Sequence, residues 1–134
     1  MAGGGISKVF AQMSPARGML DAMDCLFCKI VAGTIPAKKL FEDEHAIAIL
    51  DINPQAPVHV LAIPKKHVAS LAKTDANDER MLGHLLNVVR ELAVEQKLGN
   101  GYRVVINTGA NGGQTVDHLH LHVLGGRAMH WPPG

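Results

Sequence analysis

The feature that most constrains this 134-residue chain is an alternation of histidine with apolar residues near its C-terminal end. Residues 117–123 run Asp-His-Leu-His-Leu-His-Val, so three histidines fall within five positions. A period of two is that of a β-strand, in which successive side chains point to opposite faces of a sheet. We therefore predict a strand over Val116–Leu124, with His118, His120 and His122 on one face and apolar side chains on the other.

Along such a strand the imidazoles would stand roughly 6.6–7 Å apart. Imidazole changes charge near neutral pH, so a neutral ring can attack an electrophile while a charged ring donates to phosphate oxygens. A row of imidazoles therefore favours nucleophilic or acid–base chemistry at phosphorus, because the resulting nitrogen–phosphorus bond is labile enough to be hydrolysed. A three-histidine metal site and a polar, solvent-facing strand are the alternatives.

A glycine-rich loop directly precedes this strand and fits the same chemistry. Thr108–Thr115 runs Thr-Gly-Ala-Asn-Gly-Gly-Gln-Thr, and glycines let backbone N–H groups turn toward an anion. Asn107 offers an amide donor before the loop, and Thr115 offers a hydroxyl at its end. An ordinary hairpin is the alternative, and the position just before three histidines favours a phosphate-binding loop.

The rest of the pattern predicts an α+β domain. Asp78–Leu98 carries leucines and valines at helical spacing, and Gly99 is expected to end this helix in the left-handed conformation. A short helix is predicted over Asp24–Ala32, with Asp24 as its N-cap and Gly33 as its end. Further strands are predicted at Leu40–Phe41, His45–Leu50, Val58–Ile63 and Tyr102–Asn107.

Five strands with short connections favour an antiparallel sheet that carries the long helix on one face. Hydrophobic residues make up 47% of the chain and charged residues 19%, so a single packed domain is expected. The net charge of +1 argues against a dedicated nucleic-acid binder. No apolar run approaches the roughly 20 residues that a membrane-spanning helix needs.

Residues 1–22 are expected to form a flexible extension, because Gly3–Gly5 and Ser14-Pro15 interrupt any helix. This stretch lacks the apolar block of a secretory signal. We therefore predict a folded domain over residues 23–134 and a cytoplasmic protein. Nuclear access and a mitochondrial presequence are left open as alternatives.

Two cysteines, Cys25 and Cys28, stand three positions apart in the first predicted helix. A disulfide between them would close too short a loop to cross-link the fold. Two cysteines at this spacing can bind one zinc ion if two histidines complete a tetrahedron. Two small core-facing thiols are the alternative, and a redox dithiol is disfavoured because no strand feeds this helix as in thioredoxin-like folds.

Several motifs of the chain agree with one known pattern. They are His118–Leu124, Asp51–His59, Ile63–His67, Gly101–Arg103 and Gly125–Gly134. Together they resemble the histidine-triad (HIT) superfamily, in its histidine-triad nucleotide-binding branch, over about residues 24–134. The resemblance implies a HIT-like fold with five antiparallel strands, one long helix and one short helix, and a ten-stranded sheet in a homodimer.

This branch implies an enzyme that hydrolyses purine nucleoside phosphoramidates. Adenosine 5′-phosphoramidate is such a substrate and releases AMP and an amine, and aminoacyl-adenylates are further substrates, which carry a phosphorus–oxygen bond at the same place. By resemblance, His120 is the nucleophile and carries the nucleotide in a covalent intermediate, and His122 donates to the phosphate. The backbone carbonyl of His118 orients His120, and His59 supports the triad from a neighbouring strand, with an ordinary buried, hydrogen-bonded histidine as the alternative. The leaving amine needs a proton, and either an imidazolium or a relay through Thr115 is expected to supply it.

The resemblance also implies the remaining contacts of the nucleotide and of a metal. Asn107, Gly113, Gln114 and Thr115 correspond to the phosphate and leaving-group contacts, and Asp51 to the carboxylate that accepts from the ribose hydroxyls. The purine pocket maps onto Leu26, Phe27, Ile30, Ile49 and Ile52, each of which is also an ordinary core residue. Trp131 lies in a tail that the branch places against the partner subunit's site. A structural zinc ion, as in a related uridylyltransferase, maps onto Cys25, Cys28, His67 and His118.

No catalytic metal is expected, because Asp117 is the lone carboxylate beside the triad. Two further functions remain open. One is a dinucleoside polyphosphate hydrolase or nucleotidyl transferase of another branch, although transferases commonly carry Gln where His122 stands. The other is a nucleotide- and zinc-binding regulatory module.

Overall fold

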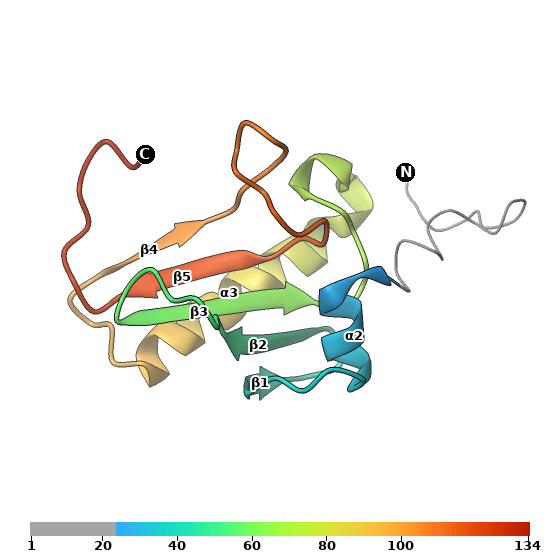
Figure 1. Cartoon of the computed structure of the whole chain (residues 1–134), viewed down its shortest axis with the longest axis horizontal. Helices are drawn as coiled ribbons and strands as arrows, with labels where there is room; N and C mark the ends of the chain where they lie inside the picture. Colours follow the sequence, from blue (N-terminus) through green and yellow to red (C-terminus); the bar gives the residue numbers. More distant parts are fainter. Residues whose placement is uncertain (1–23) are drawn as a thin grey trace, which may run out of the picture.

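The computed structural model describes residues 24–134, so the predicted extension over 1–22, with its mitochondrial alternative, lies outside the described residues. Five strands form one antiparallel sheet in the order β1-β2-β3-β5-β4 (Figure 1). The elements are α2 (Leu26–Ala32), β1 (Lys39–Glu42), β2 (Ala46–Leu50), β3 (Val58–Pro64), η1 (Leu71–Lys73), η2 (Ala76–Asp78), α3 (Glu79–Glu95), β4 (Tyr102–Val105) and β5 (Leu121–Gly125). This confirms the predicted fold class.

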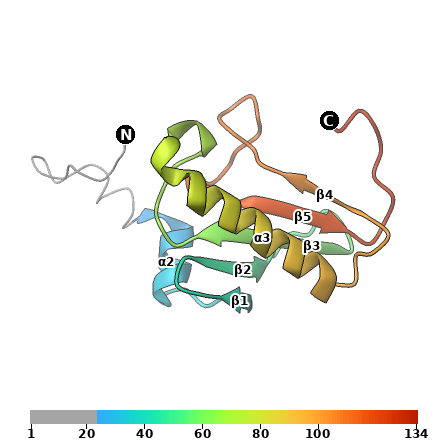
Figure 2. The same cartoon turned by 180° about the vertical axis from the view of Figure 1, so that it is seen from behind.

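The long helix α3 covers one face of the sheet (Figure 2). Small side chains of β2, such as Ala46 and Ala48, pack beneath it because they let the helix approach the strand closely. Leu121 and Val123 of β5 point to the same face, as the alternation of the histidine segment predicts. The core on this face is completed by Val60, Ala62, Leu85, Val88, Val89, Leu92, Ala93, Leu98 and Leu119.

The opposite face of the sheet is also covered. The sequence predicted a short helix but did not place it on this face. The short helix α2 packs there against the larger side chains of β2 and β3, at the end of the sheet seen in Figure 1. Ile47 and Ile49 alternate with the alanines of β2, so this strand is apolar on both faces. Cys25, Phe27, Ile30, Leu61 and Ile63 complete this second cluster.

The start of the histidine strand differs from the sequence prediction. β5 begins at Leu121 rather than Val116, and β4 ends at Val105 rather than at the predicted Asn107. The N–H of Leu119 instead donates to the carbonyl of Val68, 2.7 Å away. His118 and His120 therefore lie just outside the regular sheet.

The helix ends also depart from the prediction at two residues. α3 ends at Glu95, and Lys97 rather than Gly99 takes the left-handed conformation, with φ of 60°. The first turn of α2 is capped by the Cys25 sulfur, which accepts from the N–H of Cys28, and not by Asp24. Gly33 ends α2 in the left-handed conformation as predicted, with φ of 82°.

Within residues 24–134, the longest helix is neither long nor apolar enough to cross a membrane.

We predict that Leu92→Ala lowers the free energy of unfolding by about 2–5 kcal/mol, because it leaves a cavity between α3 and the sheet. Leu92 is 2% exposed, whereas Leu86 on the same helix is 54% exposed. Leu86→Ala is the matched control and is expected to cost about 0.5 kcal/mol or less. Urea denaturation of the two variants measures the difference, and equal losses would contradict this account of the core.

Candidate functional site

Strands β3 and β5 place two histidines side by side on the α2 face of the sheet. In the antiparallel register, Leu61 lies opposite His122 and His59 lies opposite Leu124. Since alternate residues share a face, His59 and His122 are diagonal neighbours there. Their ring centroids are 5.1 Å apart. The sheet itself therefore fixes the distance between these two imidazoles.

A chain of hydrogen bonds sets the tautomers of both rings. The backbone N–H of Gln55 donates to Nδ1 of His59 at 3.0 Å, so the proton of this neutral ring sits on Nε2. Nε2 of His59 in turn donates to Nδ1 of His122 at 2.9 Å. The proton of His122 must then sit on its Nε2. This buried atom has no hydrogen-bond partner among the described residues.

His120 has the opposite tautomer. Its Nδ1 donates to the backbone carbonyl of His118 at 2.7 Å, which leaves a lone pair on Nε2. Phe27 of α2 packs edge-on against the His120 ring, with centroids 5.0 Å apart. The rings of His120 and His122 are 4.9 Å apart, closer than the strand spacing predicted. A nucleophilic nitrogen and a donor nitrogen are thus neighbours in one site.

Asp51 supplies the negative charge beside this histidine pair. Its Oδ2 lies 3.4 Å from Nε2 of His59, and its Oδ1 accepts from the N–H of Asn53 at 2.8 Å. The side chain follows β2 directly, so the start of the β2–β3 connection positions it. Its field raises the pKa of His59, His120 and His122, against the larger effect of burial.

Burial keeps these rings neutral. It lowers the pKa of His122 to about 4, and the neighbouring His120 and His59 add to this shift. Burial likewise lowers the pKa of His59 and of His120, although the carbonyl of His118 raises the latter. A neutral His120 ring keeps its Nε2 lone pair at neutral pH.

A second cluster joins the four residues predicted as metal ligands. Nδ1 of His118 lies 3.2 Å from Sγ of Cys25, 3.5 Å from Sγ of Cys28 and 3.2 Å from Nδ1 of His67. The Cys28 sulfur and Nδ1 of His67 are also 3.2 Å apart. Four ligand atoms around zinc at ordinary bond lengths would stand roughly 3.3–3.8 Å from one another. The cluster could therefore hold a metal ion.

The surroundings of the cluster fit a cation. Nε2 of His118 donates to the carbonyl of Pro64 at 2.8 Å, so the lone pair of Nδ1 faces the cysteines. A backbone acceptor behind a histidine is the usual support of a metal ligand. Burial and the neighbouring Cys25 raise the pKa of Cys28 to about 12, so a metal would have to displace its proton. Two sulfurs and two nitrogens in this arrangement are compatible with zinc.

The glycine-rich loop is held by one of its own side chains. Oε1 of Gln114 accepts from the N–H of Gly109 at 3.0 Å, and its Nε2 donates to the carbonyls of Ala69 and Val116. The N–H groups of Gly112, Gly113 and Gln114 donate to carbonyls within the loop. Gly113 is required where it stands, since its φ is 82°. The glycine N–H groups that were expected to face an anion therefore already have acceptors here.

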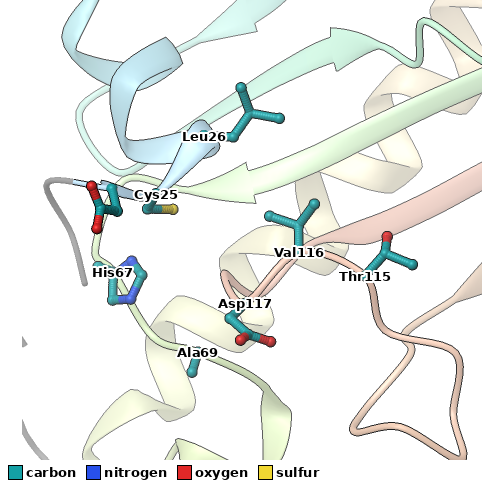
Figure 3. Close-up of a pocket in the computed structure, with 8 residues that line it drawn as sticks. Cys25, Leu26, His67, Ala69, Thr115, Val116 and Asp117 are labelled. Carbon is teal, nitrogen blue, oxygen red and sulfur yellow. The ribbon is translucent and has the colours of Figure 1, made fainter.

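We call Cys25, Cys28, His67 and His118 the metal cluster, after the ion that they could hold. A cavity of about 580 Å³ opens beside it. The cavity is lined by Cys25 and Leu26 at the start of α2, by His67 and Ala69 in the segment after β3, and by Thr115–Asp117 in the segment before β5 (Figure 3). Asn107, at the far end of the loop, is half-buried.

Comparison with known proteins agrees with this geometry. The HIT domain matches residues 32–129. The chain belongs to the HIT family. An uncharacterized HIT-like protein of Synechococcus elongatus is 51% identical over 111 residues, which is 83% of this chain and 97% of that protein.

Solved HIT structures share the fold. A HIT family hydrolase from Legionella pneumophila matches with a TM-score of 0.82 and 50% identity, covering 83% of this chain and 100% of that chain. A histidine triad nucleotide-binding protein from Candida albicans matches with a TM-score of 0.71 and 38% identity, covering 81% of this chain and 83% of that chain.

The residues expected at a purine pocket divide between core and surface of the HIT fold. Phe27 and Ile30 of α2 and Ile49 of β2 are buried between the helix and the sheet. Ile52 is 100% exposed, Leu26 is 43% exposed, and Trp131 in the C-terminal tail is 82% exposed.

Two supporting groups were not found from the sequence. The N–H of Gln55 and the carbonyl of Pro64 fix ring orientations at the two clusters. Both are backbone groups, so the type of residue carries no signal for them. The phenyl ring of Phe27 was expected in a purine pocket, and its contact with His120 has no signal in the local pattern either.

We predict that His122 titrates with a pKa near 4, well below the ordinary value of 6.5. The unfolded chain binds a proton at this ring near pH 6.5, but the folded chain does so only near pH 4. The contribution of His122 to the free energy of unfolding therefore falls as the pH is lowered through this interval, and it levels off below it. NMR titration of the ring checks the pKa, and His122→Asn should reduce the pH dependence of stability without abolishing it, because burial also lowers the pKa of His59, His118 and His120. A midpoint near 6.5 would contradict the prediction.

Proposed function

We propose that the protein is a purine nucleoside phosphoramidase that cleaves the phosphorus–nitrogen bond of adenosine 5′-phosphoramidates and the phosphorus–oxygen anhydride bond of aminoacyl-adenylates. One observation carries the proposal. His120 presents an unprotonated Nε2, and the adjacent His122 presents a protonated Nε2 without a partner. A lone pair beside a donor suits attack on a phosphorus atom whose oxygen needs stabilisation.

In the first step, Nε2 of His120 attacks phosphorus and forms a nitrogen–phosphorus bond. The bond to the leaving nitrogen breaks, its electron pair goes to that nitrogen, and a proton relayed through Thr115 lets it depart as an amine. Nε2–H of His122 donates to a phosphate oxygen as charge develops there. The carbonyl of His118 stabilises the proton on Nδ1 of the attacking ring.

In the second step, a water molecule attacks the phosphorus of the nucleotidylated His120. The histidine–phosphorus bond breaks, its electrons return to Nε2, and AMP is released with the proton balance restored by solvent. His59 holds His122 in its donor tautomer throughout, since it occupies Nδ1. Both steps use nitrogen atoms that the fold already orients.

The remaining contacts place the nucleotide. Asp51 accepts from the ribose hydroxyls, and the purine lies among the side chains around α2 and the β2–β3 connection. The phosphate and leaving group meet the end of the glycine-rich loop. The residues we assign to these contacts are Leu26, Phe27, Ile30, Ile49, Ile52, Asn107, Gly113, Gln114 and Thr115.

We also propose a homodimer that joins two sheets into one of ten strands. β4 is an edge strand of the five-stranded sheet, and Tyr102 at its start is 41% exposed. An exposed edge is where another strand can add by backbone hydrogen bonds. The tail with Trp131 would then reach the partner's site.

The names of two relatives support a nucleotide hydrolase. The Legionella pneumophila protein is named a HIT family hydrolase, and the Candida albicans protein a histidine triad nucleotide-binding protein. Neither name specifies the bond that is cleaved, so the His120 and His122 tautomers carry that part of the proposal.

The metal cluster is proposed to hold a structural zinc ion through Cys25, Cys28, His67 and His118. When bound, zinc supplies a rigid tetrahedral cross-link between α2, the segment after β3 and the segment before β5. His118 would then be fixed by its ring while its carbonyl orients His120.

We predict that the purified protein releases a fluorescent amine from an adenosine phosphoramidate. His120→Ala should lower this rate by about a thousandfold or more, because the attacking nitrogen is lost. His45→Ala is the matched control, since this ring lies at the start of β2, is 68% exposed and contacts Glu44. An active His120→Ala variant would disprove the proposed nucleophile.

The same assay separates the alternative function. A wild type that is inactive on the phosphoramidate but cleaves a dinucleoside polyphosphate would point to the other enzymatic branch. Inactivity on both substrates together with tight AMP binding would point to a binding module.

We predict about one zinc ion per chain in protein purified without chelators. Cys28→Ala should lose the metal and lower the melting temperature, because the tetrahedron loses a corner. Asp51→Asn is the control, since Asp51, His59 and His122 form a second cluster of possible ligands whose ring nitrogens already share a hydrogen bond. Elemental analysis measures the metal content. Metal that is retained by Cys28→Ala but lost by Asp51→Asn would contradict the prediction, because the ion would then lie in the cluster of Asp51, His59 and His122.

A further inference from the structure

The tautomers of His59 and His122 depend on two groups outside the sheet, the peptide of Gln55 at Nδ1 of His59 and the Asp51 carboxylate 3.4 Å from its Nε2. The N–H of Gln55 is a fixed donor, and its bond to Nδ1 of His59 starts the chain that leaves the proton of His122 on Nε2. If that peptide moved, Nδ1 of His59 could keep the proton instead. Nε2 of His59 would then accept, and His122 would present a lone pair where the proposed reaction needs a donor.

The loop that carries this peptide has little packing of its own. The residues from Ile52 to Gln55 are exposed, and Ile52 has no contact with the core that would anchor it. Two hydrogen bonds link Asn53 within the loop, one to Asp51 and one to the Gln55 side chain. These bonds shape the turn but do not tie it to another part of the described chain.

Arg127 provides that tie from the C-terminal tail. Its Nη2 donates to the carbonyl of Gln55 at 3.1 Å. Its Nη1 donates to the carbonyl of Ala128 at 3.0 Å and contacts the Met129 sulfur at 3.3 Å, which orients the guanidinium plane. Among residues 24–134, the bond from Arg127 to Gln55 is the side-chain hydrogen bond that links residues 52–57 to a segment remote in sequence.

The backbone brings the tail to this loop. Gly126 turns the chain with φ of 90°, and a Cβ placed there would lie 2.9 Å from Cβ of Pro57. The first tail residue after β5 therefore lies directly against the end of the loop, and Arg127 follows it. The position of the guanidinium is set by a close approach that a larger residue at 126 would prevent.

We infer that Arg127 is a positioning residue that acts on His122 through the Gln55 peptide and His59. The inference rests on the proposed function, in which His122 donates to the phosphate. The Arg127 side chain bonds to Gln55, Ala128 and Met129 and to neither histidine. It holds the loop so that one backbone N–H keeps two imidazoles in the tautomers that the reaction requires.

The experiment compares Arg127→Met with wild type by the ¹⁵N NMR signals of the histidine ring nitrogens, which distinguish protonated from unprotonated atoms. Met keeps an apolar stem but removes the donors. Arg103→Met is the matched control, because Arg103 also donates to a tail carbonyl, that of His130 at 2.8 Å, without touching the loop. Melting temperatures of both variants show that each is folded.

In wild type and Arg103→Met, Nε2 of both His59 and His122 is expected to be protonated. In Arg127→Met, His122 should show a mixture in which Nδ1 carries the proton in part of the molecules. Phosphoramidate hydrolysis by Arg127→Met should fall about two- to tenfold in kcat, in proportion to the molecules that lose the donor tautomer, with KM changed less, because a misaligned group loses rate more than binding. Arg127→Lys, which keeps one donor, should recover part of the loss.

The ring signals keep this inference separate from the proposed function. Unchanged His59 and His122 signals in Arg127→Met would overturn the inference, even if the wild type hydrolyses phosphoramidates. A tautomer shift in Arg127→Met, found together with a wild type that lacks phosphoramidase activity, would support the positioning role and refute the proposed function. An equal tautomer shift in Arg103→Met would also overturn it, since the effect would then belong to the tail as a whole.

Discussion

His118 is the residue on which the two halves of the site depend. Its ring is fully buried and lies among Cys25, Cys28 and His67, while its backbone carbonyl accepts the proton of His120. A single residue therefore joins the cluster of possible metal ligands to the His120 ring, whose Nε2 has a free lone pair. Because Nε2 of His118 is held by Pro64 at the end of β3, the sheet transmits its rigidity to both.

The sequence was sufficient for the fold class and for several residues that the structure brings together. The period of two over 117–123 placed Leu119, Leu121 and Val123 in the core, and the spacing of the cysteines identified two members of the metal cluster. The start of β5 and the end of α3 were less well predicted. Both depend on whether a neighbouring strand or a left-handed residue such as Lys97 is available, and local propensity does not encode that.

The parts that sequence reasoning missed are backbone groups and packing partners. The N–H of Gln55 and the carbonyl of Pro64 act through position alone, so any residue type could supply them. The second covered face of the sheet was likewise missed, although the run Ala46–Leu50 is apolar on both faces. A strand without a polar face indicates packing on both sides, and this signal was present in the sequence.

The hydrogen-bond chain from Gln55 to His122 has a direction, and this direction has a consequence for repeated turnover. A row of imidazoles alone could carry its protons in either direction along the row, because each neutral ring has two tautomers. The backbone N–H at one end is not titratable and cannot reverse. In the proposed reaction, a proton lost from Nε2 of His122 would therefore be replaced on the same atom, and the network would return to one ground state.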